Sequence, residues 1–187
     1  SPDLIIGNKE ENTREQIEAL RQEFPVWMSD ITTPADALDM ITALGLLCHR
    51  EDEATRLHTA VADLLQRVKN ALQGRSVAYL IWNRPYMVAA ANTFVHNLLE
   101  HLGLVNVFAG LDRYPEVSAE QLADARPDLC FLSSEPFPFQ TTHVKDLQQL
   151  LPNTRVRLVD GEVFSWYGSR LLHLESYLER EMADLRR

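Results

Sequence analysis

Aromatic and charged side chains gather directly after several short apolar segments of the chain. The residues in these positions are Lys9, Trp82, Arg84, Tyr86, Glu135, Phe137, Trp166, Tyr167 and Arg170. Large flat rings with a few polar groups suit a large, partly apolar ligand. Arg84 and Arg170 could grip carboxylates or phosphates on such a ligand, or stack on its rings. The pattern predicts a ligand-binding pocket; the alternative is that the rings fill the ends of a sheet and the arginines are solvated.

The sequence holds no recognisable catalytic motif. It lacks a glycine-rich phosphate loop, a G-x-S-x-G elbow and an H-E-x-x-H helix. His96 and His101 are five residues apart on one predicted helix, so they face different directions and are interpreted as surface or packing residues. Ser133-Ser134-Glu135 has no histidine nearby in sequence that could act as a base. We therefore predict no catalytic residue, no metal site and no cofactor.

Short apolar runs alternate with helical segments along the chain. Six runs rich in Val, Ile, Leu and aromatic residues predict strands at 3–7, 25–29, 77–82, 105–108, 128–133 and 155–160. The signals for helix ends are Thr13 with Gln16, Ser118 with Gln121, Thr33 before Pro34, and Gly103. This alternation predicts an α/β protein with parallel sheets covered by helices. In such sheets, ligands bind beyond the carboxyl ends of the strands.

One predicted helix is longer than the others. Apolar residues form a single stripe across residues 51–73, and Gly74 ends it. The simplest arrangement is two three-layer α/β lobes joined by one long rigid helix, with residues 1–50 in the N-terminal lobe, 51–74 in the connecting helix and 75–187 in the C-terminal lobe. We expect the first lobe to be incomplete, because two strands and two helices bury little apolar surface. An open sheet edge there could support a dimer.

Composition narrows the class of protein. A chain of 187 residues with 45% hydrophobic content is long enough for one substantial domain or two small lobes. The formal net charge of -9 argues against binding to nucleic acid. Cys48 and Cys130 lie in no metal or redox motif and are interpreted as small buried hydrophobic residues. With no membrane-spanning run and no leader, the sequence predicts a cytoplasmic protein or one whose leader has been removed.

Four stretches of the sequence resemble the periplasmic substrate-binding proteins of ABC importers for vitamin B12, ferric siderophores and haem. They read PDLIIGNKEENTREQIEAL, NTFVHNLLEHLGLVNVFAG, RYPEVSAEQLADARPDLCFLSS and VDGEVFSWYGSRLL. The resemblance implies two α/β lobes joined by a helix, a metal chelate bound in the cleft between them, and delivery to an ABC permease. It also implies a periplasmic or lipid-anchored extracytoplasmic location, and a first lobe that begins with further strands.

The resemblance also implies roles for individual residues. Glu120 matches a glutamate that docks onto arginines of the permease. Tyr114 matches a position at which a vitamin B12-binding relative carries a ligand-stacking tryptophan, and the pair Trp166-Tyr167 matches a loop of the cleft. The basic residues Arg84, Arg170 and Lys9 favour an anionic ligand such as a ferric siderophore or haem, whereas the many aromatic residues would also suit a corrinoid.

Two hypotheses from different classes follow. The first is a non-catalytic binding protein that captures a ferric siderophore, cobalamin or haem and delivers it to an ABC permease. The second is a cytoplasmic α/β enzyme or regulator of related two-lobe architecture that uses Glu135 or His143 chemically. The second predicts a pH-dependent rate controlled by those residues, but no motif supports it.

Overall fold

The computed structural model describes residues 1–185. In its first part the elements are β1 (Ile5–Asn8), α1 (Arg14–Arg21), β2 (Val26–Ser29), α2 (Pro34–Leu47) and α3 (Glu51–Val68). The middle part contains β3 (Arg75–Trp82), β4 (Tyr86–Val88), α4 (Phe94–His101), β5 (Leu104–Asn106), β6 (Glu116–Val117) and α5 (Ala119–Asp124). The last part contains β7 (Leu129–Ser133), α6 (Thr141–Leu150), β8 (Arg155–Val159), α7 (Gly161–Ser165), a 3₁₀ helix (Ser169–His173), α8 (Leu174–Glu181) and a second 3₁₀ helix (Ala183–Leu185).

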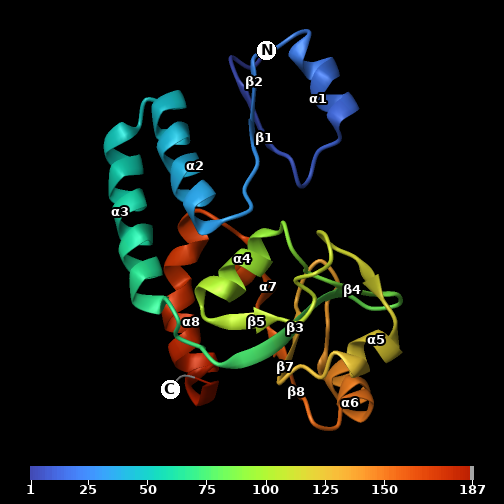
Figure 1. Cartoon of the computed structure of the whole chain (residues 1–187). Coiled ribbons are helices and arrows are strands. Elements are labelled where there is room, and N and C mark those ends of the chain that lie inside the picture. The colour runs from blue at the N-terminus through green and yellow to red at the C-terminus, as the bar shows by residue number, and fades with distance from the viewer. Residues whose placement is uncertain (186–187) are drawn as a thin grey trace.

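The first lobe is a two-stranded parallel sheet with one helix. β1 and β2 pair in register from Ile5 opposite Val26 to Asn8 opposite Ser29. The connection between them contains α1, whose buried residue is Ile17. This unit forms the top of the molecule in Figure 1, above the larger lobe. Its strands end at Asn8 and Ser29, on the side that faces the rest of the chain.

A pair of antiparallel helices, α2 and α3, leads from the first lobe to the second (Figure 1). Thr33 and Asp36 form a capping box at the start of α2, with Pro34 at its first position, as the sequence predicts. Gly45 lets the two helices approach closely, because a Cβ atom at this position would collide with Cβ of Ala54.

The second lobe is built on a six-stranded sheet in the order β6-β4-β3-β7-β8, with β5 also paired to β3. The first half of β3 pairs in parallel with β5 and its second half pairs with the antiparallel β4. β3, β7 and β8 form the parallel centre. The predicted parallel sheet is therefore confirmed at its centre, and the short antiparallel strands β4 and β6 extend one edge.

Successive residues of β3 bury opposite faces of this sheet. Val77 and Tyr79 join a core formed with α3, α4, α7 and α8, whereas Ala78 and Leu80 join a second core formed with α5 and α6. Both faces are covered, which explains why the central strands read as continuous apolar runs rather than as alternating patterns. The α/β class and the three-layer organisation of this lobe agree with the sequence prediction.

Several local predictions are wrong. The connecting helix ends at Val68 rather than near Gln73, because the N–H groups of Asn70 and Leu72 donate to the last carbonyls of the α4 segment, at His101 and Leu102. The side chain of Thr13 makes no capping hydrogen bond.

Two further corrections concern exposure and secondary structure. Cys48 is exposed, while Cys130 is buried. The segment after Asp160, in which Trp166 and Tyr167 were matched to a loop of the cleft, is helical over Gly161–Ser165 and Ser169–His173. Phe164 is consequently buried in the core and does not reach the cleft. Within residues 1–185, every helix is too short or too polar to span a bilayer.

Candidate functional site

A cavity of about 730 Å³ lies between the two lobes. The loop after β1 contributes Asn8, Glu10 and Glu11. The middle of the second lobe contributes Tyr79, Ile81, Val95 and Tyr114. The segments after β7 and β8 contribute Ser133, Glu135, Pro136, Ser165, Trp166 and Tyr167. The cavity therefore lies largely beyond the carboxyl ends of parallel strands, where ligands bind in open α/β sheets.

The first-lobe wall of the cavity is a compact turn. The side chain of Asn8 accepts a hydrogen bond from the N–H of Glu11 at 2.7 Å, and the backbone carbonyl of Asn8 accepts one from the side-chain amide of Asn12 at 2.8 Å. This turn orients Glu10 towards the second lobe. Its carboxylate forms an ion pair with Arg113 at 2.6 Å and lies 3.4 Å from the Tyr114 hydroxyl, which donates to it. The two lobes are thus joined across the cavity by a charged contact.

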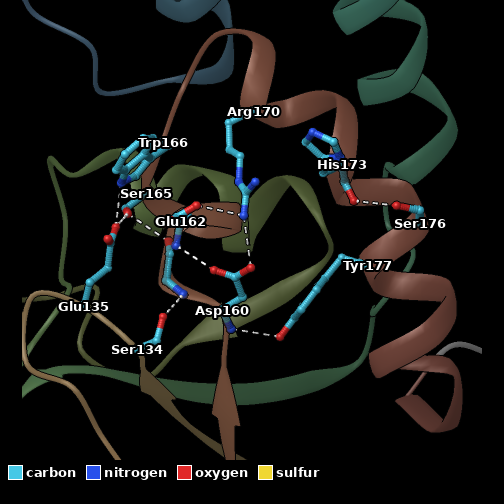
Figure 2. Close-up of polar contacts among 11 residues, drawn as sticks. Ser134, Glu135, Asp160, Glu162, Ser165, Trp166, Arg170, His173, Ser176 and Tyr177 are labelled. Carbon is cyan, nitrogen blue, oxygen red and sulfur yellow. Dashed lines mark hydrogen bonds and ion pairs between the residues drawn. The ribbon is translucent and has the colours of Figure 1, made fainter.

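Glu135 organises the opposite wall. Trp166 Nε1 donates to Glu135 Oε1 at 2.7 Å, and the Ser165 hydroxyl lies 2.8 Å from the same oxygen. Figure 2 shows both side chains directed at this carboxylate from the end of α7. Residue Trp166 is 53% exposed, so the hydrogen bond to Glu135 fixes a ring that is otherwise open to solvent. An amphipathic ring held in this way presents a flat face to a ligand.

A glycine allows α7 to pack against the end of β7. The N–H of Gly161 donates to Ser134 Oγ at 2.9 Å, and Asp160 caps the helix by accepting from the N–H of Glu162 at 3.1 Å (Figure 2). A Cβ atom at Gly161 would lie 2.6 Å from Cγ of Glu135 and still closer to Ser133 Oγ. The position of Glu135 in the cavity wall therefore depends on residue 161 being a glycine, which has no side chain.

Three tyrosines of the lining remain protonated at neutral pH. Burial raises the pKa of Tyr79, whose hydroxyl donates to Ser133 Oγ at 3.2 Å. Burial and the nearby Glu10 carboxylate raise the pKa of Tyr114. Burial, followed by the charges of Glu10 and Glu11, raises the pKa of Tyr167. Each ring therefore enters the site as a neutral phenol, with an aromatic face and a hydroxyl group.

The structure brings four of the predicted ligand-binding residues together in the lining: Tyr114, Glu135, Trp166 and Tyr167. The other six lie outside it: Lys9, Trp82, Arg84, Tyr86, Phe137 and Arg170. Ligand binding by any of the ten stays a prediction.

The three basic residues among those six lie outside the lining because two of them pair with carboxylates elsewhere and the third lies in the β3–β4 turn. Lys9 pairs with Asp30 at 2.6 Å. Arg170 pairs with Asp160 at 3.2 Å and Glu162 at 2.8 Å. Arg84 is exposed in the turn between β3 and β4. The expectation of an anionic ligand depended on these three side chains, and none of them lines the cavity.

The aromatic residues outside the lining form a separate cluster beside the β3–β4 hairpin. The rings of Trp82 and Phe137 are 5.6 Å apart, and Phe137 also packs edge-on against Phe139 and His143. Tyr86 begins β4 and pairs with Val117 of β6. The packing of these rings matches the alternative interpretation from the sequence, in which they fill the end of a sheet.

The residues of the enzymatic hypothesis have structural partners. His143 accepts a hydrogen bond from the N–H of Gln140 at 2.9 Å at the start of α6 and does not line the cavity. Glu135 is held by Trp166 and Ser165 as described above. In the part of the chain that the structure describes, no group of three or more His, Cys, Asp or Glu side chains is arranged to hold a metal ion.

Among the ionisable residues of the lining, sequence reasoning missed Glu10, Glu11 and Tyr79. The two glutamates lie two and three residues after β1, so the rule that placed Lys9 near the site could have found them as well. Tyr79 lies within β3, where its side chain reads as part of an apolar core and gives no signal of a cavity.

Comparison with known proteins agrees with this geometry. A model of the periplasmic binding protein family matches residues 1–156. The chain belongs to this family. A comparison with curated protein sequences found no significant match. The similarity is therefore carried by the family pattern and by the fold.

Solved structures with the same fold cover almost the whole chain. The vitamin B12-binding protein BtuF of Vibrio cholerae is 22% identical, with a TM-score of 0.76, covering 98% of this chain and 74% of that one. The heme-binding protein RhuT of Roseiflexus sp. RS-1 is 19% identical, with a TM-score of 0.79, covering 100% and 78%. An ABC-type Fe3+-hydroxamate transport protein of Saccharomonospora viridis is 24% identical, with a TM-score of 0.70, covering 95% and 68%.

Proposed function

We propose that this protein is the substrate-binding component of an ABC importer, and that it captures a metal chelate in the cavity between its lobes. The observation that carries the proposal is the cavity itself, in a chain that belongs to the periplasmic binding protein family. Its volume of about 730 Å³ lies in the upper part of the range for small-molecule sites. Aromatic rings and a few fixed polar groups line it, which suits a large and partly apolar ligand.

Vitamin B12, haem and ferric hydroxamates are the chelates to test, because structurally similar proteins are described as binding or transporting them. Isothermal titration calorimetry with each chelate should give saturable binding at one site. Mass spectrometry of the recovered ligand should show it unchanged, since a carrier releases what it binds. Absence of binding to the whole panel, or chemical conversion of any member, would contradict a carrier role.

We further propose that Glu120 contacts the permease. Its side chain is exposed in the first turn of α5, and a hydrogen bond from Ser118, together with the backbone N–H of Glu120, lowers its pKa. A carboxylate at this position is stabilised at the helix N-terminus and is available to an arginine of a partner. In reconstituted transport, Glu120→Ala should reduce uptake without changing ligand affinity. Asp124→Ala, on the same helix, should change neither the uptake nor the ligand affinity. Equal uptake by both variants would refute the docking role.

The dimer through an open sheet edge also stays a proposal. β1 and β2 form a sheet of two strands, and each strand is paired along one side only in the described part of the chain. Unpaired edges can template association with another chain. Light scattering across a concentration series should show a mass that rises towards that of a dimer, and a constant monomer mass would count against the proposal.

A further inference from the structure

The cavity wall carries negative charge that basic side chains balance only in part. Three lining residues are carboxylates, namely Glu10, Glu11 and Glu135, and within residues 1–185 no Lys, Arg or His belongs to the lining. Of the nearby cations, Arg113 pairs with Glu10, and Lys9 and Arg170 are held by carboxylates outside the lining. A carboxylate or phosphate on a ligand would therefore meet like charge here.

Two of the three carboxylates remain available to a ligand. Glu10 is neutralised by Arg113 at 2.6 Å. Glu135 accepts hydrogen bonds only from neutral groups, through Oε1, and no ion pair found within residues 1–185 includes Glu135 or Glu11. Neutral donors orient a carboxylate without cancelling its charge. The site thus presents a fixed anion in the second lobe and another on the loop of the first lobe.

Aromatic rings stand beside these anions. Trp166 is tied to Glu135 through its indole N–H, and Tyr167 follows it in the chain. Tyr167 packs edge-on against Phe94, with ring centroids 5.5 Å apart, so its ring is held in place. Burial and the surrounding carboxylates keep its phenol protonated. Aromatic faces next to carboxylates attract cations, and such cages recognise alkylammonium groups.

We propose that the ligand of this cavity is a metal chelate with a net positive charge, which places an alkylammonium group between Glu11, Glu135 and the rings of Trp166 and Tyr167. This inference rests on the proposed binding function and adds the charge of the ligand to it. It replaces the anionic chelate that the basic residues of the sequence favour, because those residues lie outside the cavity.

The test uses three chelates that share one metal-binding core and carry a cationic, a neutral or an anionic pendant group. A ferric trishydroxamate with a pendant alkylammonium group is compared with its N-acetylated form, which is neutral, and its N-succinylated form, which is anionic. Calorimetry at low salt should give affinities that fall about ten-fold at each step, the size expected for adding or removing one charge contact in a partly hydrated site. Added salt should compress the differences.

Variants then assign the preference to the cavity. Glu135→Gln keeps the hydrogen-bond acceptor but removes the charge, and it should lower the ratio of cationic to neutral affinity about ten-fold. Glu11→Gln, on an exposed loop, should lower it several-fold and guards against misfolding of the first variant. Glu23→Gln makes the same charge change after α1, away from the cavity lining, and should leave the ratio unchanged.

The outcomes separate the two proposals. Three results would overturn the cationic ligand and leave the binding function standing. They are equal affinity for the three chelates, tighter binding of the succinylated form, and a ratio of cationic to neutral affinity that is unchanged in both Glu135→Gln and Glu11→Gln. Failure of these chelates, cyanocobalamin and haem to bind at all would overturn the binding function, and the cationic ligand with it.

Discussion

Adding one methyl group at Gly161 tests how closely α7 packs against the end of β7. In Gly161→Ala the new Cβ would lie 2.6 Å from Cγ of Glu135 and 3.1 Å from the N atom of that residue. Overpacking of this kind costs about 1–3 kcal/mol. Alanine recovers up to about 1 kcal/mol of this, because glycine is the poorer helix former. We therefore expect the free energy of unfolding to fall by about 1–2 kcal/mol, the middle of the resulting range, and Tm to fall by about 2–8 °C.

Gly110→Ala is the matched control, because no atom lies within 4 Å of a Cβ placed there. Its free energy of unfolding should change by no more than about 0.5 kcal/mol. Urea denaturation, followed by tryptophan fluorescence and by circular dichroism, measures both variants against the parent protein. Equal stability of the two variants would refute the close packing of α7 on Ser133 and Glu135, and with it our account of how the cavity wall is positioned.

Three further predictions concern charge and exposure. Arg113→Met removes the contact with Glu10. Because both side chains are partly exposed, the free energy of unfolding should fall by at most about 1 kcal/mol. Urea denaturation at high salt should show a smaller loss. Burial opposes ionisation of Asp36, but hydrogen bonds from Thr32 and Thr33 outweigh it and lower the pKa of Asp36. Asp36→Asn should therefore destabilise the protein by about 1 kcal/mol near pH 7, and thermal melts should show the difference disappearing as the pH falls through the lowered pKa. Burial raises the pKa of Cys130 to about 12, so a thiol reagent should titrate the exposed Cys48 alone in the native protein and both thiols in denaturant.

Each of these three has a result that would contradict it. A salt-independent loss in Arg113→Met would mean that packing, rather than charge, makes the contact. A constant destabilisation of Asp36→Asn down to pH 2 would remove the carboxylate from the capping box. Rapid reaction of two thiols in the native protein would place Cys130 outside the core.

The sequence predicted the central strands well because each is a short apolar run with clear ends. All six predicted strands exist, with ends shifted by a few residues. β4 and β6 were missed because they contain only three and two residues, too few for a pattern to appear. The end of α3 was misplaced because backbone hydrogen bonds to the α4 segment, which lies far along the chain, stop the helix before its apolar stripe ends.

The candidate site was predicted in part for a physical reason. Chain topology places the ends of β1, β7 and β8 near one another, so the residues that follow those strands could be found from the sequence. The ion pairs could not be found in this way. Lys9 and Arg170 were selected by their charge, but the partners that hold them away from the lining, Asp30 and Asp160, are identified only by the fold.

The most direct test of the central claim is to determine which tryptophan has its fluorescence quenched by a bound chelate. Trp166 lines the cavity and Trp82 does not. The parent protein should show saturable quenching by its chelate after correction for absorption, Trp82→Phe should retain it, and Trp166→Phe should lose most of it. Quenching that survives in Trp166→Phe and disappears in Trp82→Phe would place the ligand at the β3–β4 hairpin and contradict binding between the lobes.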